Sequence, residues 1–64
     1  MEITKKVLNQ HSNKRLDKAS SEIFSDFSRS QLKKWIQEGR VLLNNEIASP
    51  KDHVYEDDEI MVNP

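Results

Sequence analysis

The sequence contains no cysteine, one glycine and no long apolar run. Without cysteine, the 64-residue chain forms no disulfide, offers no thiolate to a metal and has no cysteine nucleophile. No run approaches the roughly 20 apolar residues that cross a bilayer, and residues 1–6 lack the apolar segment of a signal peptide. We therefore expect a cytoplasmic protein without a membrane partner.

Patterns typical of enzymes and metal sites are also missing. The chain is one small domain at most, with a thin core into which a substrate cleft is hard to fit. His11 and His53 fall in expected loops without a partner at metal-ligand spacing, and we interpret both as surface histidines. The acidic run 56–59 is interpreted as a solvated turn. We expect no catalytic residue, metal, cofactor or small-molecule ligand in this chain.

The net charge of −1 hides an uneven distribution. Residues 1–40 carry nine basic and five acidic side chains, which gives +4, whereas residues 41–64 carry one and six, which gives −5. A phosphate group responds to the local field within a Debye length of about 8–10 Å rather than to the total charge. The first forty residues are therefore compatible with nucleic-acid binding.

The spacing of apolar residues predicts an α+β domain, in which two packed helices precede a small antiparallel sheet. We expect a short edge strand within residues 2–8. Helical spacing indicates two helices within 14–38, the first of them from Lys14 to Phe24. After Gly39 the pattern changes to short strands within 41–62, with a tight turn at 44–45.

The second helix has the clearest local signals. Ser28 is the expected N-cap, Gln31 completes a capping box, and Gly39 ends the helix. The short turn 25–28 makes this a helix-turn-helix arrangement whose helices pack at an angle.

One side of this second helix is basic. At 100° per residue, Arg29, Lys33 and Gln37 fall within one stripe of about 80°. Hydroxyl groups stand at the helix N-terminus, where free N–H groups already favour a phosphate. A phosphate backbone suits this set, although a solvated basic face is the alternative, and we assign Trp35 to the core rather than to base stacking. The residues selected on these grounds are Ser28, Arg29, Ser30, Lys33 and Arg40.

Three runs carry a resemblance to a known family: RLDKA at 15–19, FSDFSRSQLKKWI at 24–36 and GRVLLN at 39–44. They resemble the RNA-binding domain named after ribosomal small-subunit protein four, the S-four domain, whose helical core is called the alpha-L motif. More narrowly, the chain is similar to the N-terminal domain of the large-subunit ribosomal RNA pseudouridine synthases of the D type. The resemblance covers nearly the whole chain, with matching spacing between the runs.

This resemblance implies that RNA is gripped along the two-helix face and the turn after it. The family's Asn-Gly-Lys hairpin tip is here Asn44-Asn45-Glu46, and its Gly-Asp-Glu turn is the acidic 57–59, which moves the sheet away from the expected contact surface. Lys34 points away from the basic stripe and ranks lower than its neighbours. The RNA-binding residues that the resemblance implies are Arg15, Ser28, Arg29, Ser30, Lys33, Lys34, Arg40, Asn44 and Lys51.

Asp17 stands in a run similar to the His-Arg-Leu-Asp stretch that holds the catalytic aspartate of those synthases. Here Lys14 replaces the histidine, and the run begins the first expected helix. We therefore expect Asp17 to favour the helix N-terminus or to orient an arginine rather than to act in catalysis.

Residues 1–64 are interpreted as a single RNA-binding domain that targets an rRNA pseudouridine synthase, with the catalytic domain not present in this chain. The resemblance implies that the full enzyme, an isomerase, converts uridine to pseudouridine without a cofactor. The expected partner is structured RNA, namely large-subunit ribosomal RNA, and the expected state is a monomer. One alternative is a stand-alone ribosome-associated protein of the same fold that binds the large subunit. Another is a protein-interaction module.

Overall fold

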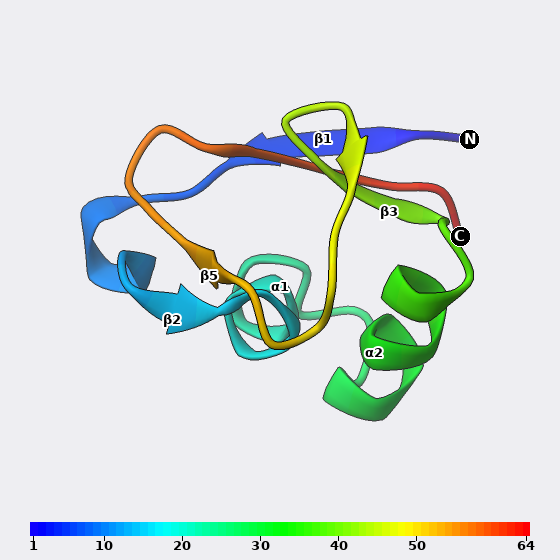
Figure 1. Cartoon of the computed structure of the whole chain (residues 1–64). Coiled ribbons are helices and arrows are strands. Elements are labelled where there is room, and N and C mark those ends of the chain that lie inside the picture. The colour runs from blue at the N-terminus through cyan, green and yellow to red at the C-terminus, as the bar shows by residue number, and fades with distance from the viewer.

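Both helices lie on one side of the main sheet, as the computed structural model of residues 1–64 shows (Figure 1). This arrangement confirms the predicted α+β class with two packed helices and antiparallel strands. Neither helix is long and apolar enough to cross a membrane. The elements in chain order are β1 (Ile3–Lys6), the 3-10 turn η1 (Asn9–His11), β2 (Lys14–Arg15), α1 (Leu16–Ile23), α2 (Arg29–Gln37), β3 (Val41–Leu43), β4 (Glu46–Ile47), β5 (His53–Val54) and β6 (Glu59–Val62).

The main sheet has four antiparallel strands in the order β1-β6-β3-β4. The first strand is an edge strand, as predicted, and pairs with the last strand in the register Ile3 to Val62. Alternate residues of β6, Ile60 and Val62, are fully buried. The sheet thus presents one apolar face to the helices and brings the two ends of the chain together (Figure 1).

A second, two-stranded sheet joins β2 to β5, with Lys14 opposite Val54 and Arg15 opposite His53. The first helix therefore begins at Leu16, and the predicted start at Lys14 is wrong. The cause is tertiary, because pairing with β5 holds residues 14–15 in the extended conformation. The pairing also removes β5 from the small sheet that was expected to include it.

Ten buried apolar side chains, from both helices, from β3, β5 and β6 and from the segments beside them, form the core. Trp35 is half-buried against this core, as predicted, and meets the Phe27 ring edge-to-face at a centroid distance of 5.1 Å. The core residues are Val7, Leu16, Ala19, Phe24, Leu32, Ile36, Val41, Val54, Ile60 and Val62.

The structure confirms the predicted N-cap and the predicted end of α2, but only one half of the predicted capping box. Ser28 is the N-cap, and its Oγ accepts a hydrogen bond from the backbone N–H of Gln31 at 3.1 Å. The reciprocal side-chain bond of a full capping box is not formed. Gly39 follows the helix at φ +80°, where a side chain would be strained. Asn44 and Asn45 both have positive φ, at 51° and 65°, which lets a two-residue turn join β3 to β4.

The two histidines have different environments. His53 is exposed, as expected, but it belongs to β5 rather than to a loop. His11 is only 5% exposed, so the interpretation of this residue as a surface histidine is wrong. It lies in η1, a short turn that the sequence pattern did not indicate, and its Nε2 lies 3.9 Å from Oε1 of Glu22 on α1.

Candidate nucleic-acid interface

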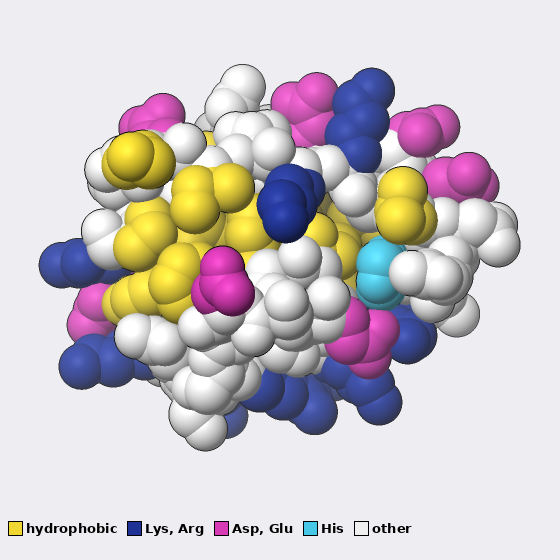
Figure 2. Space-filling model, turned by 180° about the vertical axis from the view of Figure 1, so that it is seen from behind, with side chains coloured by type: hydrophobic (Ala, Val, Ile, Leu, Met, Phe, Trp, Pro, Cys, Tyr) yellow, Lys and Arg dark blue, Asp and Glu magenta, His cyan; other side chains and the backbone are white.

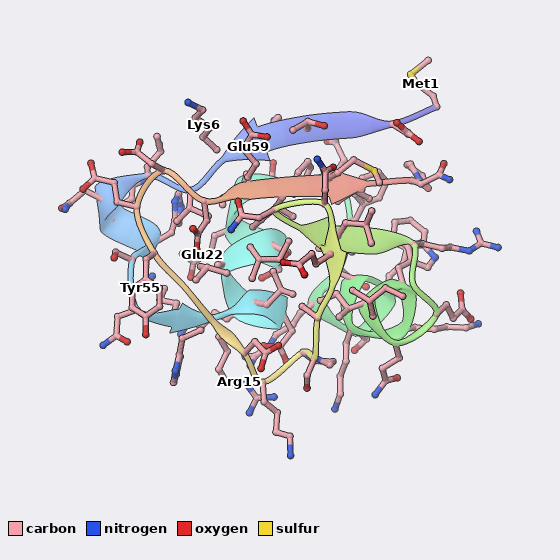
Figure 3. All side chains as sticks on the ribbon, turned by 45° about the horizontal axis from the view of Figure 1, so that its top comes forward. Met1, Lys6, Arg15, Glu22, Tyr55 and Glu59 are labelled. Atoms are coloured by element: carbon pink, nitrogen blue, oxygen red, sulfur yellow. The ribbon has the colours of Figure 1, made fainter.

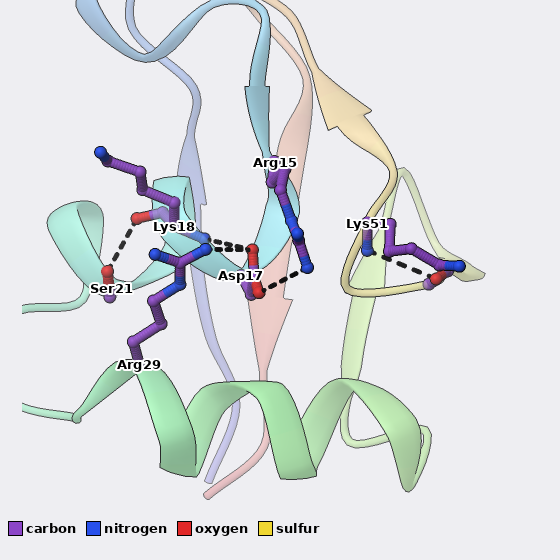
Figure 4. Close-up of polar contacts among 7 residues, drawn as sticks. Arg15, Asp17, Lys18, Ser21, Arg29 and Lys51 are labelled. Carbon is purple, nitrogen blue, oxygen red and sulfur yellow. Dashed lines mark hydrogen bonds and ion pairs between the residues drawn. The ribbon is translucent and has the colours of Figure 1, made fainter.

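The carboxylate of Asp17 is the central polar group of the helical side of the molecule. It is only 1% exposed, and such a charge requires hydrogen-bond partners. Its Oδ2 accepts from Nη2 of Arg15 at 3.2 Å, and its Oδ1 accepts from Nη2 of Arg29 at 3.4 Å (Figure 4). Oδ1 also accepts from the backbone N–H of Lys18 at 2.8 Å. One buried carboxylate therefore orients two arginines, which agrees with the arginine-orienting role expected for Asp17.

The two guanidinium groups stay accessible although they are held by a buried group. The side chains of Arg15 and Arg29 are 44% and 49% exposed. A guanidinium has five N–H donors, and each of these two uses one of them on Asp17. Arg15 reaches the carboxylate from β2 and Arg29 from the first position of α2, so three elements meet at this point (Figure 4). The remaining donors are free to bind an anion.

The loop 49–52 packs against the first turn of α1 and brings a lysine to the same side. The backbone N–H of Leu16 donates to the carbonyl of Asp52 at 2.6 Å, and that of Asp17 donates to the carbonyl of Pro50 at 3.2 Å. Lys51 is exposed on this loop, next to Arg15 in the view of Figure 4. The structure thus brings the loop that carries Lys51 to the start of α1, although the two segments are remote in sequence.

The N-terminus of α2 continues this surface. Ser28 and Ser30 are exposed on either side of Arg29. The first N–H groups of a helix lack intrahelical acceptors and attract anions. Lys33 lies one turn further along α2, is exposed and forms no ion pair. Hydroxyl groups, backbone amides and cationic side chains therefore share one side of the helix.

Three of the residues expected to bind RNA lie at the margin of this surface or apart from it. Lys34 is exposed about 100° around the helix from Lys33. Arg40 follows the far end of α2, where its Nε lies 3.4 Å from Oε1 of Glu38. Asn44 is at the β3–β4 turn, and its Oδ1 accepts from the backbone N–H of Glu59 at 2.9 Å. The structure does not bring Asn44 to the helices.

One basic residue of this surface was absent from the set selected by sequence. Lys18 is exposed on the first turn of α1, directly after Asp17, and forms no ion pair. The sequence did contain a signal for Lys18, because Lys14 and Lys18 are one helical turn apart on the polar side of the predicted first helix.

Figure 2 shows Lys and Arg side chains gathered along the lower edge of the molecule. The helices lie on the same lower side in Figure 1.

We call this surface the helical face, and its chemistry is that of an anion-binding surface. No three His, Asp or Glu side chains are placed to hold a metal ion. The acidic residues of β4, of the 56–58 turn and of β6 lie on other elements. The helical face consists of Arg15, Lys18, Ser28, Arg29, Ser30, Lys33 and Lys51, with Lys34 and Arg40 at its margins.

Comparison with known proteins gives one family and one group of relatives. The family model of the S4 domain matches residues 14–60. The relatives include proteins named ribosomal large subunit pseudouridine synthase D from Vibrio cholerae, Escherichia coli and Xylella fastidiosa. The Vibrio cholerae protein is 43% identical over 47 residues, which cover 73% of this chain and 14% of the relative. The Escherichia coli protein is 36% identical over 64 residues, which cover 98% of this chain and 20% of the relative. The Xylella fastidiosa protein is 48% identical over 42 residues, which cover 66% of this chain and 13% of the relative. The chain thus spans a fifth or less of the length of these three relatives.

Proposed function

Because this chain belongs to the S4 family of RNA-binding domains, we propose that it docks on structured large-subunit ribosomal RNA and targets a pseudouridine synthase to that RNA. The similarity to the named synthases supports this assignment, since it covers up to 98% of the chain. Residues 1–64 act as one domain and supply affinity and placement. The isomerisation of uridine belongs to a catalytic domain outside these residues.

The observation that carries the proposal is the pair of arginines bonded to Asp17. A guanidinium binds a phosphate through two parallel hydrogen bonds, and its planar group must be oriented to do so. Asp17 supplies that orientation from within the protein, so less side-chain freedom is lost when the phosphate arrives. Asp17 cancels one of the two positive charges, but Lys18, Lys33 and Lys51 keep the helical face positive.

The helical face recognises the shape and the phosphate backbone of the RNA. The helical face offers hydroxyl, ammonium and guanidinium groups, and Trp35, the largest aromatic side chain near it, packs against the core. Folded RNA presents phosphates and 2′-hydroxyls at fixed spacings, which such groups can contact without reading bases. Asn44 lies apart from the face and is assigned the smallest part in binding.

The test is a titration of a structured large-subunit rRNA fragment at several salt concentrations. We expect the logarithm of the association constant to fall linearly with the logarithm of salt concentration, because bound phosphates release counterions. Arg29→Ala with Lys33→Ala should weaken binding at least tenfold and reduce the slope, since two cations of the helical face are lost.

A control double variant has the same change of net charge at a distance from the helical face. Thr4→Glu with Asn45→Asp alters exposed residues of β1 and of the β3–β4 turn, and aspartate tolerates the positive φ of Asn45. It should keep affinity within about threefold of the parent protein, because distant exposed charges are largely screened. Salt-independent binding, or equal losses in the two double variants, would refute the proposal.

A further inference from the structure

A pocket of about 290 Å³ opens between β1, η1 and the last turn of α1. None of its lining residues belongs to α2 or to the loop 49–52, so the pocket is separate from the helical face. Figure 3 shows two of these residues, Lys6 and Glu22, away from the labelled Arg15. The lining residues are Lys5, Lys6, Leu8, Gln10, His11, Glu22 and Ile23.

Two apolar side chains contribute to the pocket wall. Leu8 is 55% exposed, so most of its side chain is available to a ligand. Ile23 is half-buried against the core on the α1 side. Flat ligands bind between such groups because both of their faces leave water. The volume is close to the lower limit of small-ligand pockets, about 300 Å³, and suits a group of the size of a nucleobase.

Hydrogen-bonding groups in the pocket are incompletely satisfied by the protein. Oε1 of Glu22 accepts from the Lys14 ammonium at 2.9 Å, whereas Oε2 has no hydrogen-bond partner. The amide nitrogen of Gln10 lies 3.5 Å from Nε2 of the buried His11, which is too far for a strong bond. Nδ1 of His11 has no partner. A free acceptor and an amide donor therefore lie near each other, as the edge of a nucleobase requires.

The ionisation state of Glu22 suits an acceptor. The hydrogen bond from the Lys14 ammonium holds the pKa of the Glu22 carboxyl below its usual value of 4.5. Glu22 is therefore a carboxylate near neutral pH and accepts hydrogen bonds without donating any.

The rim of the pocket is positively charged. Lys5 and Lys6 form no ion pair with a carboxylate. The Lys5 ammonium instead lies 5.5 Å from the centroid of the Phe24 ring. Lys5 and Lys6 are successive residues of β1, so their side chains leave opposite faces of the strand, and Lys6 points away from Glu22 in Figure 3. The Lys5 ammonium is therefore the cation that fits the phosphate of a group inside the pocket.

We propose that this pocket binds one unpaired nucleotide of the RNA that the helical face holds. The base lies between Leu8 and Ile23, donates a ring N–H or amino proton to Oε2 of Glu22 and accepts from the Gln10 amide. Its phosphate lies against the Lys5 ammonium at the rim. The cations Lys14 and Lys18, from β2 and the first turn of α1, extend positive charge from the arginine pair toward Glu22. The inference rests on the proposed function, because the nucleotide belongs to the same RNA.

The first experiment uses CMP and UMP as probes, with ribose 5-phosphate as the ligand that lacks a base. Both nucleotides should shift the amide resonances of Leu8, Gln10 and Ile23 saturably, with dissociation constants of about 1–10 mM. Ribose 5-phosphate should bind about tenfold more weakly, because it cannot fill the space between the apolar side chains. No saturable shift at these amides, or equal binding of ribose 5-phosphate, would overturn the proposal.

The second experiment compares Glu22→Ala with Glu46→Ala, which changes the net charge equally at an exposed position of β4. Loss of a negative charge by itself strengthens the binding of a phosphate. We nevertheless expect Glu22→Ala to weaken CMP binding about tenfold, because the base loses a charged hydrogen-bond acceptor. Glu46→Ala should change it less than twofold. A gain in affinity in both variants would mean that the site responds to charge alone and would contradict the proposal.

The third experiment separates this inference from the proposed function. RNA with an unpaired loop should lose about fivefold in affinity in Glu22→Ala, whereas a blunt RNA duplex should be unaffected. If CMP binds but loop-containing RNA does not respond to Glu22→Ala, the site takes free nucleotides only and the inference fails. If structured RNA binds in a salt-dependent manner while CMP leaves the pocket amides unshifted, the inference fails and the proposed function stands. If the pocket takes CMP but structured RNA does not bind, the proposed function fails, and with it the assignment of the nucleotide to RNA.

Discussion

Asp17 on α1 contacts Arg29 on α2 across the turn that joins the two helices, with 3.4 Å between Oδ1 of the carboxylate and Nη2 of the guanidinium. The aspartate is buried and the arginine is half exposed. The contact therefore links the packing of the helices to the direction in which a surface cation points.

Asp17→Asn should weaken RNA binding even though it makes the protein more positive. The neutral amide accepts more weakly from the two arginines, so their orientation is lost. We expect affinity for structured rRNA to fall about threefold to tenfold, and the free energy of unfolding in urea to fall by about 1–2 kcal/mol. Asp26→Asn changes the net charge equally at an exposed residue and should leave both quantities nearly unchanged. Tighter binding by Asp17→Asn would argue against an orienting role.

Arg15 and Arg29 should act as one unit in RNA binding, because they share a carboxylate. A double-mutant cycle of Arg15→Ala and Arg29→Ala should give a coupling energy of about 0.5–2 kcal/mol. Arg15→Ala with Lys34→Ala serves as the control cycle, because Lys34 forms no contact with Asp17. We expect that control to be additive within about 0.5 kcal/mol. Additivity in both cycles would mean that the two arginines bind independently.

Ser28→Ala should destabilise the domain by about 1 kcal/mol in urea unfolding, because the backbone N–H of Gln31 loses its acceptor. Ser30→Ala, two positions later, removes an exposed hydroxyl that makes no such bond and should cost less than about 0.5 kcal/mol. Equal stabilities of the two variants would show that the cap contributes nothing to α2.

The ion pair between Lys14 and Glu22 should make stability depend on acid pH. The pKa of Glu22 is lower in the folded protein than its unfolded value of 4.5. The ion pair therefore stabilises the folded protein at pH values above 4.5, and this contribution is lost as the pH falls through the folded pKa. Lys14→Ala should therefore be less stable than the parent protein near neutral pH, and the difference should disappear below that window. Carboxyl chemical shifts of Glu22 in the two proteins report the same change, with a higher pKa in the variant. An unchanged titration of Glu22 would contradict this account.

Much of the helical face could be predicted because its signals are local. Ser28 and Gly39 mark the ends of α2 by their own conformational preferences, and the positions of Arg29 and Lys33 follow from helical periodicity. Asn44-Asn45 likewise predicts its turn from two residues that tolerate positive φ. In each case a few neighbouring residues determine the local conformation of the backbone.

The features that the sequence did not predict depend on distant partners. Residues 14–15 continue a helical pattern, but pairing with β5 makes them a strand. The burial of Asp17 and of His11 has no local signature, since both are polar residues in polar surroundings along the chain. The neighbours that cover them come from other elements, such as the 49–52 loop and α1. Lys18 was left out because neither the basic stripe of the second helix nor the family resemblance included it.

The pairing of β1 with β6 has a consequence for biosynthesis. Ile3 is synthesised before every other element of the domain, whereas its strand partner Val62 belongs to the last strand, β6. The helices and the β3–β4 hairpin form from contacts nearby in the chain, so they can assemble first. The N-terminal strand has no other partner in the sheet and must wait, at the entropic cost of closing a loop of almost the whole domain. Folding of the domain therefore finishes with β1, the strand that is synthesised before its other elements.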